Sequence, residues 1–205
     1  MGNILNYGDY GNTKGLSNKC NEYIAYINEH IENVRKAYLK LFCNPNLHLE
    51  IEGYTDDQIH QIIEELEIVI RSHDMSKFGS EEFYAYRNKF FPTELEEMKM
   101  KTDSDYTESI NISFESAWQH HYLNNDHHPK FWGPNKDMSL LAIFHMICDW
   151  EAMSIKFNSK TIDWYNNSAK DEKEQFSPKT KIVVETILEQ LFDVTLPKDG
   201  GTSES

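Results

Sequence analysis

The sequence is poor in cysteine and contains no long apolar run, and each shortage excludes a class of protein. Its three cysteines, Cys20, Cys43 and Cys148, are widely spaced and form no C-x-x-C motif, which predicts free thiols rather than a disulfide framework. No apolar run approaches the roughly 18 residues that a membrane-spanning helix needs. Residues 1–8 show neither a basic segment nor an apolar leader, so we expect a cytoplasmic protein without membrane association.

Basic residues are also scarce, because 20 Lys and Arg face 34 Asp and Glu, for a formal net charge of −14. Such a chain offers no clustered basic face to the backbone of an extended nucleic acid. A small phosphorylated substrate stays possible, because bound metal ions can supply local positive charge in an acidic protein. With 39% hydrophobic residues, the 205-residue chain can bury a core and is expected to form one domain.

Apolar residues recur at three- and four-residue steps over most of the chain, which predicts helices. The expected helices run from Ser17 to the break at Asn44, from a capping box at Thr55 to His73, from Glu81 to about Phe90, from about Tyr106 to Leu123, from Met138 (capped by Asp137) to about Phe157, and from about Pro178 onward. No segment alternates as a strand would. The predicted fold class is therefore all-α, a single-domain bundle of about five to seven helices.

The remaining segments set the predicted domain boundaries. We expect residues 1–16 to be a flexible N-terminal arm, residues 17–195 a helical metal-binding domain, and residues 196–205 a disordered tail. Residues 92–105 are charged and weakly patterned, which predicts a mobile surface excursion, and whether it is a lid stays open. Residues 124–134 predict a structured loop, because Pro129 stops a regular helix.

Histidines are frequent, and their clustering is the strongest chemical signal. Four of the nine lie within nine residues, at positions 120, 121, 127 and 128. Adjacent His73 and Asp74, at the end of a predicted helix, can both ligate one metal ion. Each candidate also has an ordinary explanation: His30 fits a satisfied boundary histidine, Asp74 a helix cap, and Lys77 an exposed lysine at a helix end.

Asp149 is the most telling single carboxylate. It lies between Cys148 and Trp150 on a helix that is apolar nearly all round. A carboxylate there needs a strong partner, and a metal ion is one of few good choices. His145 lies one turn before Asp149 on the same face, so it could ligate a metal or hold Asp149 by a hydrogen bond.

The order of these residues resembles that of HD-domain metal-dependent phosphohydrolases, whose ligands follow the pattern H…HD…H…H…D. The segment from His73 to Lys77 is also similar to the HD-x-x-K variant of some members. More narrowly, HDMSKF, AWQHHYLNNDHHPKFW and MICDWEAMS resemble an uncharacterised family found in phages and bacteria, over about residues 23–157. The resemblance implies an HD-domain-like helical fold, located in the host cytoplasm if the protein is phage-encoded.

The resemblance also implies a ligand set. A first metal ion would be held by His30, His73, Asp74 and Asp149. In two-metal members the aspartate bridges to a second ion, for which the candidates here are His121 with His127 or His128. His120 and His121 point about 100° apart on a helix, so only one is expected to face the metals. The implied cofactor is one or two divalent ions of Mn, Fe, Co, Ni or Zn, with Mg possible.

The implied function is hydrolysis of a nucleotide or a related small phosphoester by a metal-activated water. Asp74 would hold that water, Lys77 and Arg71 would stabilise charge on the phosphoryl group, and Trp132 could stack on a base. One alternative is a di-iron HD-type oxygenase. The other is a non-catalytic phage accessory protein that binds a host signal or a host protein. The substrate, the native metal and the oligomeric state stay open.

Overall fold

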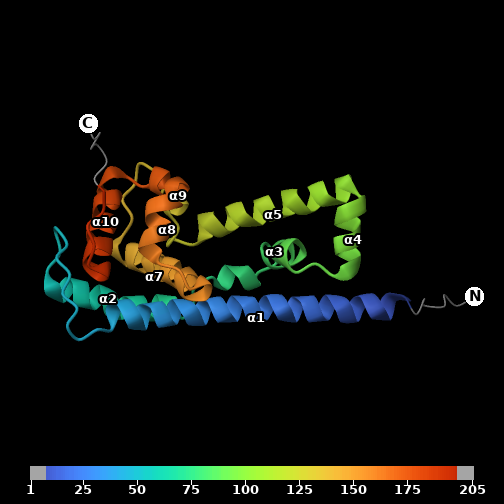
Figure 1. Cartoon of the computed structure of the whole chain (residues 1–205), viewed down its shortest axis with the longest axis horizontal. Coiled ribbons are helices and arrows are strands. Elements are labelled where there is room, and N and C mark those ends of the chain that lie inside the picture. The colour runs from blue at the N-terminus through green and yellow to red at the C-terminus, as the bar shows by residue number, and fades with distance from the viewer. Residues whose placement is uncertain (1–7, 198–205) are drawn as a thin grey trace, which may run out of the picture. The chain divides into compact units, whose positions relative to one another are not determined.

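The chain folds as an all-α protein (Figure 1). The computed structural model describes residues 8–197, and in this range it contains ten α-helices, one 3-10 helix and no strand. The chain divides into two compact units: unit 1 comprises Met1–Ile31 and Asp74–Asn125, and unit 2 comprises Glu32–His73 and Asp126–Ser205. The all-α prediction is confirmed, and the domain expected at residues 17–195 stays a prediction. None of the described helices is long and apolar enough to cross a membrane.

Unit 1 is built around a small aromatic core. Its elements are the first part of α1 (Gly8–Phe42), the 3-10 helix η1 (Met75–Phe78), α3 (Phe83–Phe90), α4 (Glu94–Thr102) and α5 (Ser104–Asn124). Helices α3 and α4 both pack against α5. The ring of Tyr23 on α1 lies 5.2 Å from that of Phe83 and 5.5 Å from that of Phe91, centroid to centroid. Stacked and tilted aromatic rings therefore join α1 to α3.

The prediction of a mobile excursion at residues 92–105 is wrong, because this segment forms α4 and a tight turn into α5. Thr93 begins α4 through a capping box with Glu96. Both carboxylate oxygens of Glu96 accept hydrogen bonds from the guanidinium of Arg87, at 2.6 and 2.8 Å. Arg87 is only 2% exposed, so this ion pair fixes α4 to α3.

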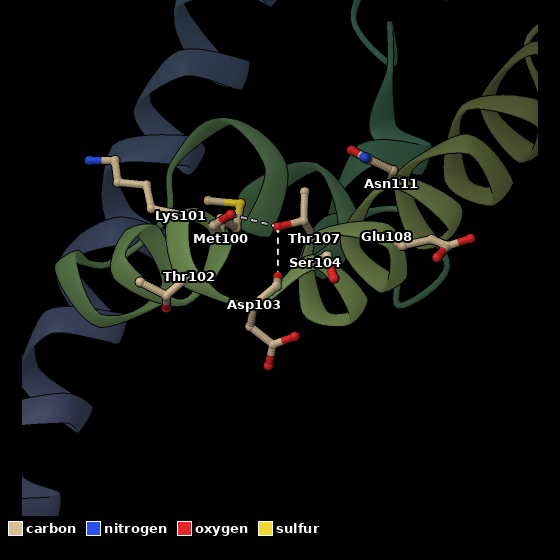
Figure 2. Close-up of a pocket in the computed structure, with 8 residues that line it drawn as sticks. All are labelled: Met100, Lys101, Thr102, Asp103, Ser104, Thr107, Glu108 and Asn111. Atoms are coloured by element: carbon tan, nitrogen blue, oxygen red, sulfur yellow. Dashed lines mark hydrogen bonds between the residues drawn. The ribbon is translucent and has the colours of Figure 1, made fainter.

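Figure 2 shows the turn between α4 and α5. The hydroxyl of Thr107 donates to the carbonyl oxygens of Met100 and Asp103, at 2.7 and 3.0 Å. The open depression drawn there is lined by residues 100–104, 107, 108 and 111, at the start of α5. His121 lies ten residues after Asn111 on the same helix, roughly 15 Å away at 1.5 Å per residue. The depression is thus separate from His121.

Unit 2 has the larger, mainly aliphatic core. Its elements are the rest of α1, α2 (Asp56–Ile70), α6 (Pro129–Trp132), α7 (Leu140–Phe157), α8 (Thr161–Asn167), α9 (Lys170–Gln175) and α10 (Pro178–Phe192). Helix α7 packs against α2 and α8, and most of its residues are buried, as its composition predicts. The capping box expected at Thr55 begins α2 and is confirmed. Helix α7 is capped by Ser139 rather than Asp137, whose carboxylate accepts a hydrogen bond from Ser177 instead.

Several boundaries differ from the sequence prediction. Helix α1 begins at Gly8, so residues 8–16 of the expected arm are helical, and residues 1–7 lie outside the described range. Leu196 belongs to the core of unit 2, because it is buried and its backbone N–H donates to Glu189; residues 198–205 of the expected tail lie outside the described range. Residues 129–132 form a short helix in the expected loop, because Pro129 occupies its first turn, where proline is tolerated.

Candidate metal centre

The predicted ligands fall into both units, and each unit has its own donor group. The unit 1 donor group consists of His30, Asp74 and His121. The unit 2 donor group consists of His73, His127, His145 and Asp149. Every member is buried except Asp149. The boundary between the units passes through the peptide bond joining His73 to Asp74, so the two residues of the motif serve different groups.

The backbone at Asp74 has an uncommon conformation. Helix α2 ends at Ile70, and the chain continues through a turn to Asp74, whose φ of 54° and ψ of 23° lie in the left-handed region. Few residues other than glycine adopt this region, although aspartate and asparagine tolerate it best. Such conformations persist only where the surroundings hold them, and they gather at functional sites. Asn158 and Asp193 share this conformation as the C-caps of α7 and α10, whereas Asp74 adopts it with a buried side chain.

In the unit 1 donor group, the carboxylate of Asp74 lies between two imidazoles. Nε2 of His30 lies 3.7 Å from Oδ2, and Nε2 of His121 lies 3.4 Å from Oδ1. Two ligands bound about 2.0–2.1 Å from one tetrahedral ion lie roughly 3.3–3.5 Å apart. The distance between His121 and Asp74 falls in this range and that between His30 and Asp74 is slightly longer, and imidazole–carboxylate pairs suit divalent transition metals.

Lys77 is the closest cation to Asp74 that the structure records. Its Nζ donates to Oδ2 of Asp74 at 2.5 Å and lies 5.9 Å from the ring centroid of Tyr86. The sequence analysis expected Lys77 to stabilise charge on a phosphoryl group. In the structure the ammonium of Lys77 is paired with the carboxylate of Asp74, one turn before it in the chain.

A second buried carboxylate, Glu82, was not recognised from the sequence. It is fully buried, and its two oxygens lie 2.8 Å from Nδ1 of His120 and 3.0 Å from Nδ1 of His121. Burial raises the pKa of Glu82, but the hydrogen bond and charge of His121 and the hydrogen bond of His120 outweigh it, so the pKa lies below its ordinary value. Glu82 is therefore an ionised acceptor shared by two histidines.

Tyr23 supplies a buried hydroxyl in the same unit. Its side chain is 1% exposed, and its hydroxyl has no hydrogen-bond partner among the described residues. Burial, followed by the charges of Glu82 and Asp74, raises the pKa of Tyr23 above its ordinary range, so the phenol stays protonated. A buried donor without an acceptor costs about 1–3 kcal/mol, which a bound oxygen ligand would recover.

In the unit 2 donor group, imidazoles predominate. Nδ1 of His73 lies 2.8 Å from Nε2 of His145, and Nε2 of His73 lies 3.7 Å from Oδ1 of Asp149. The ring of His127 lies 4.7 Å from that of His73 and 4.4 Å from that of His145. One nitrogen from each of these three histidines falls within 4.8 Å of the others, so the cluster could bind a metal ion. His145, whose role the sequence left open, is thus placed among the candidate ligands.

The other predicted site residues of unit 2 lie nearer the surface. The guanidinium of Arg71 donates to the exposed carboxylate of Glu67 at 2.7 Å, in an exposed pair on α2. Trp132 is partly buried against the core, and its indole N–H donates to the carbonyl of Asp126 at 2.6 Å. His128 is partly exposed, with its ring 4.2 Å from that of His127.

The sequence analysis expected Asp149 to be the buried carboxylate of α7 that needs a strong partner. In the structure that description fits Glu151, two residues further along. The side chain of Asp149 is 17% exposed, whereas Glu151 is 3% exposed. The oxygens of Glu151 accept hydrogen bonds from Lys40 and from the hydroxyl of Thr161, each at 2.6 Å. The buried carboxylate on α7 is therefore satisfied by protein groups, and Asp149 owes its candidacy to its contact with His73.

Residues 19–190 match the family of unknown function DUF5662, so the chain belongs to that family. The matched region contains every member of both donor groups, from His30 to Asp149. No curated protein and no solved structure matches the chain.

Proposed function

We propose that this member of the DUF5662 family is a metal-dependent phosphohydrolase that acts on a nucleotide or a related small phosphoester. The observation that carries the proposal is the setting of Asp74. A buried carboxylate in a left-handed backbone conformation has one imidazole beside each oxygen. Placing a charge in such a site is costly unless it is compensated, and a ligated cation is an effective compensation.

The donor groups supply imidazole and carboxylate ligands, which suit Mn, Fe, Co, Ni and Zn. Asp74, together with His121 or His30, would supply ligands to an ion in unit 1, and His73, His127 and His145 would hold an ion in unit 2. A bound divalent ion supplies a Lewis acid and lowers the pKa of water towards neutrality. The acidic protein would thereby gain local positive charge for an anionic substrate.

The chain's own residues would bind and orient that anion. Lys77 is mostly buried, with its side chain 15% exposed, and it carries a positive charge directly beside Asp74. A lysine ammonium acts on a phosphate as a point charge. Tyr23 would donate its hydrogen bond to an oxygen of the bound anion, because it has no acceptor among the described residues.

The proposal is tested with a panel of nucleotides and small phosphoesters in the presence of added Mn²⁺. We expect phosphate release by the wild-type protein and a loss of more than about 100-fold in Asp74→Asn, since a metal ligand is removed. Asparagine tolerates the left-handed conformation, so this variant keeps the fold. The matched control is Asp105→Asn, an exposed carboxylate of the same unit, which should keep full activity. Equal activity in Asp74→Asn and the control would refute the proposed site.

A di-iron HD-type oxygenase is the second candidate, and the contacts of His73 are the observation in its favour, because they bring together ligands that iron also accepts. His73 contacts both His145 and Asp149, and two histidines with one carboxylate are the ligand type of non-haem iron oxygenases. Iron in the purified protein, together with oxygen consumption and no phosphate release, would select this reaction.

A further inference from the structure

We infer that Glu82 is a positioning residue that holds the ring of His121 so that Nε2 faces Asp74, an inference that rests on the proposed metal-binding role of Asp74 and His121. The contact distances define the arrangement. Oε2 of Glu82 lies 3.0 Å from Nδ1 of His121, and Nε2 of the same ring lies 3.4 Å from Oδ1 of Asp74. The imidazole therefore stands between two carboxylates, one at each nitrogen.

The chemistry of a carboxylate fixes the position of the proton on this ring. An ionised carboxylate only accepts hydrogen bonds, so the Nδ1 that faces Glu82 must carry the hydrogen. While no metal ion is bound, Nε2 can also carry a hydrogen, because it faces the carboxylate of Asp74, and it supplies its lone pair when it gives up that hydrogen to bind an ion. A carboxylate behind a histidine in this way fixes the tautomer and raises the basicity of the ligand nitrogen.

Asn125 and Ser76 make competing contacts to Nδ1 of His121. Nδ2 of Asn125 lies 3.2 Å away and would require that nitrogen to be an acceptor, whereas the hydroxyl of Ser76, 3.3 Å away, can accept a hydrogen bond from it. The two amide hydrogens of Asn125 are already donated to the carbonyl oxygen of His121 at 2.7 Å and to the hydroxyl of Ser76 at 3.0 Å. Glu82 is therefore the group that decides the tautomer.

A tight turn between η1 and α3 directs Glu82 inward. The carbonyl oxygen of Gly79 accepts hydrogen bonds from the backbone N–H of Glu82 and of Phe83, at 3.3 and 2.9 Å. A Cβ on Gly79 would lie 3.0 Å from the carbonyl oxygen of Ser76, so the close turn leaves little room for a side chain there. The preceding carboxylate, Glu81, points outward to the hydroxyl of Ser80 and is exposed.

His120 satisfies the other oxygen of Glu82. Its Nδ1 lies 2.8 Å from Oε1, and its side chain is 37% exposed. A fully buried carboxylate with an unsatisfied oxygen would be costly, so His120 keeps Glu82 in place from the solvent side. The two adjacent histidines therefore have different roles. His121 faces Asp74, and His120 holds the carboxylate of Glu82 in place.

The test compares Glu82→Gln with Glu81→Gln, which removes the same charge one residue away on the surface. The tautomer of His121 is read from its ¹⁵N chemical shifts in metal-free protein, with the signal assigned by its loss in His121→Asn. Mn²⁺ affinity is measured by titration calorimetry. We expect a protonated Nδ1 on His121 in the wild-type protein and in Glu81→Gln, and a partly or wholly bare Nδ1 in Glu82→Gln. Mn²⁺ affinity should fall by about 10–100-fold in Glu82→Gln only.

The two readouts separate this inference from the proposed function. A bare Nδ1 on His121 in the wild-type protein would overturn the role of Glu82, and this measurement needs no variant of Glu82 that folds. Unchanged Mn²⁺ affinity in a folded Glu82→Gln would overturn it as well. The fixed tautomer in a wild-type protein that binds no Mn²⁺ would leave Glu82 as the group that orients His121 and would count against the phosphohydrolase instead.

Discussion

The two units differ in how they hold their donor groups. In unit 1 two buried carboxylates, Asp74 and Glu82, are compensated by Lys77 and by histidines, within a small core of aromatic rings. In unit 2 the buried donors are imidazoles, and the partly exposed Asp149 is the carboxylate that contacts them, beside a large aliphatic core. The buried carboxylates of unit 1 carry negative charge that a cation or a proton must balance. The buried imidazoles of unit 2 are neutral unless they bind a proton.

This difference predicts which substitutions should change metal binding and which should also change stability. Removing a charge in unit 1 unbalances a network of buried ions, so binding and stability both change. Removing an imidazole in unit 2 takes away a ligand without leaving an unpaired buried charge.

The largest further effect is expected at Lys77. In Lys77→Met the stem is kept and the charge is lost, so turnover should fall by about 100-fold because the phosphoryl group loses its cation. Metal content should be retained, because Asp74 loses a competing partner rather than a ligand. Metal analysis and steady-state kinetics on the same preparation check both points. Full turnover in Lys77→Met would mean that Lys77 only pairs with Asp74 and does not act on the substrate. A loss of metal in this variant would mean that Lys77 helps to hold the metal site together.

A stability effect limited to unit 1 is expected at Glu96. Glu96→Gln leaves the guanidinium of Arg87 buried without its carboxylate, which should lower the free energy of unfolding by about 3 kcal/mol. The control is Glu97→Gln, whose carboxylate belongs to an exposed pair with Lys101 and should change stability by less than about 0.5 kcal/mol. Denaturant unfolding followed by circular dichroism provides the measurement.

The pair between Arg87 and Glu96 should make the stability of unit 1 depend on pH. Burial raises the pKa of Glu96, but the hydrogen bonds from Arg87 and Thr93 outweigh this effect, so the pKa falls from 4.5 to about 2. Because the folded pKa is depressed, the stabilisation is complete above pH 4.5 and is lost as the pH falls from 4.5 towards 2. The stability difference between wild type and Glu96→Gln should therefore shrink in that window. A difference that stays constant down to pH 2 would contradict the ion pair.

The smallest effect has the opposite sign on stability. Tyr23→Phe removes a buried hydroxyl that has no partner among the described residues, so the protein should gain about 1 kcal/mol. Turnover should fall at the same time, because the hydroxyl would no longer donate to the substrate. A gain in stability with lower turnover identifies a functional group, whereas a loss of stability would mean that the hydroxyl is satisfied within the fold.

Local sequence patterns predicted much of the fold. The capping box at Thr55, the buried character of α7 and the helix ending near Phe157 all follow from short-range periodicity and capping. The segment at residues 92–105 was misjudged because its capping box at Thr93 and Glu96 was overlooked and because the pair between Arg87 and Glu96 links two helices. The periodicity of α4 alone gives no sign of that contact.

The candidate ligands His73 and Asp74 were predictable because adjacent histidine and aspartate at the end of a helix are a recognisable pair of metal ligands. Glu82 was missed because its neighbour Glu81 has the same side chain, and the turn at Gly79 decides which one points inward. One signal was present: the doubled histidine at 120 and 121 leaves a second imidazole that needs a partner. The division of the ligands between two units depends on long-range packing, and the order of the residues does not contain it.

The most direct test of the metal centre is elemental analysis of the protein purified without chelator, beside Asp74→Asn and His145→Asn. We expect about one or two equivalents of a first-row divalent metal in the wild type, with a loss in each variant, because each removes a ligand from one donor group. The absence of metal from the wild type even after incubation with Mn²⁺, or a metal content unchanged in Asp74→Asn, would contradict this account and favour a non-catalytic binding protein.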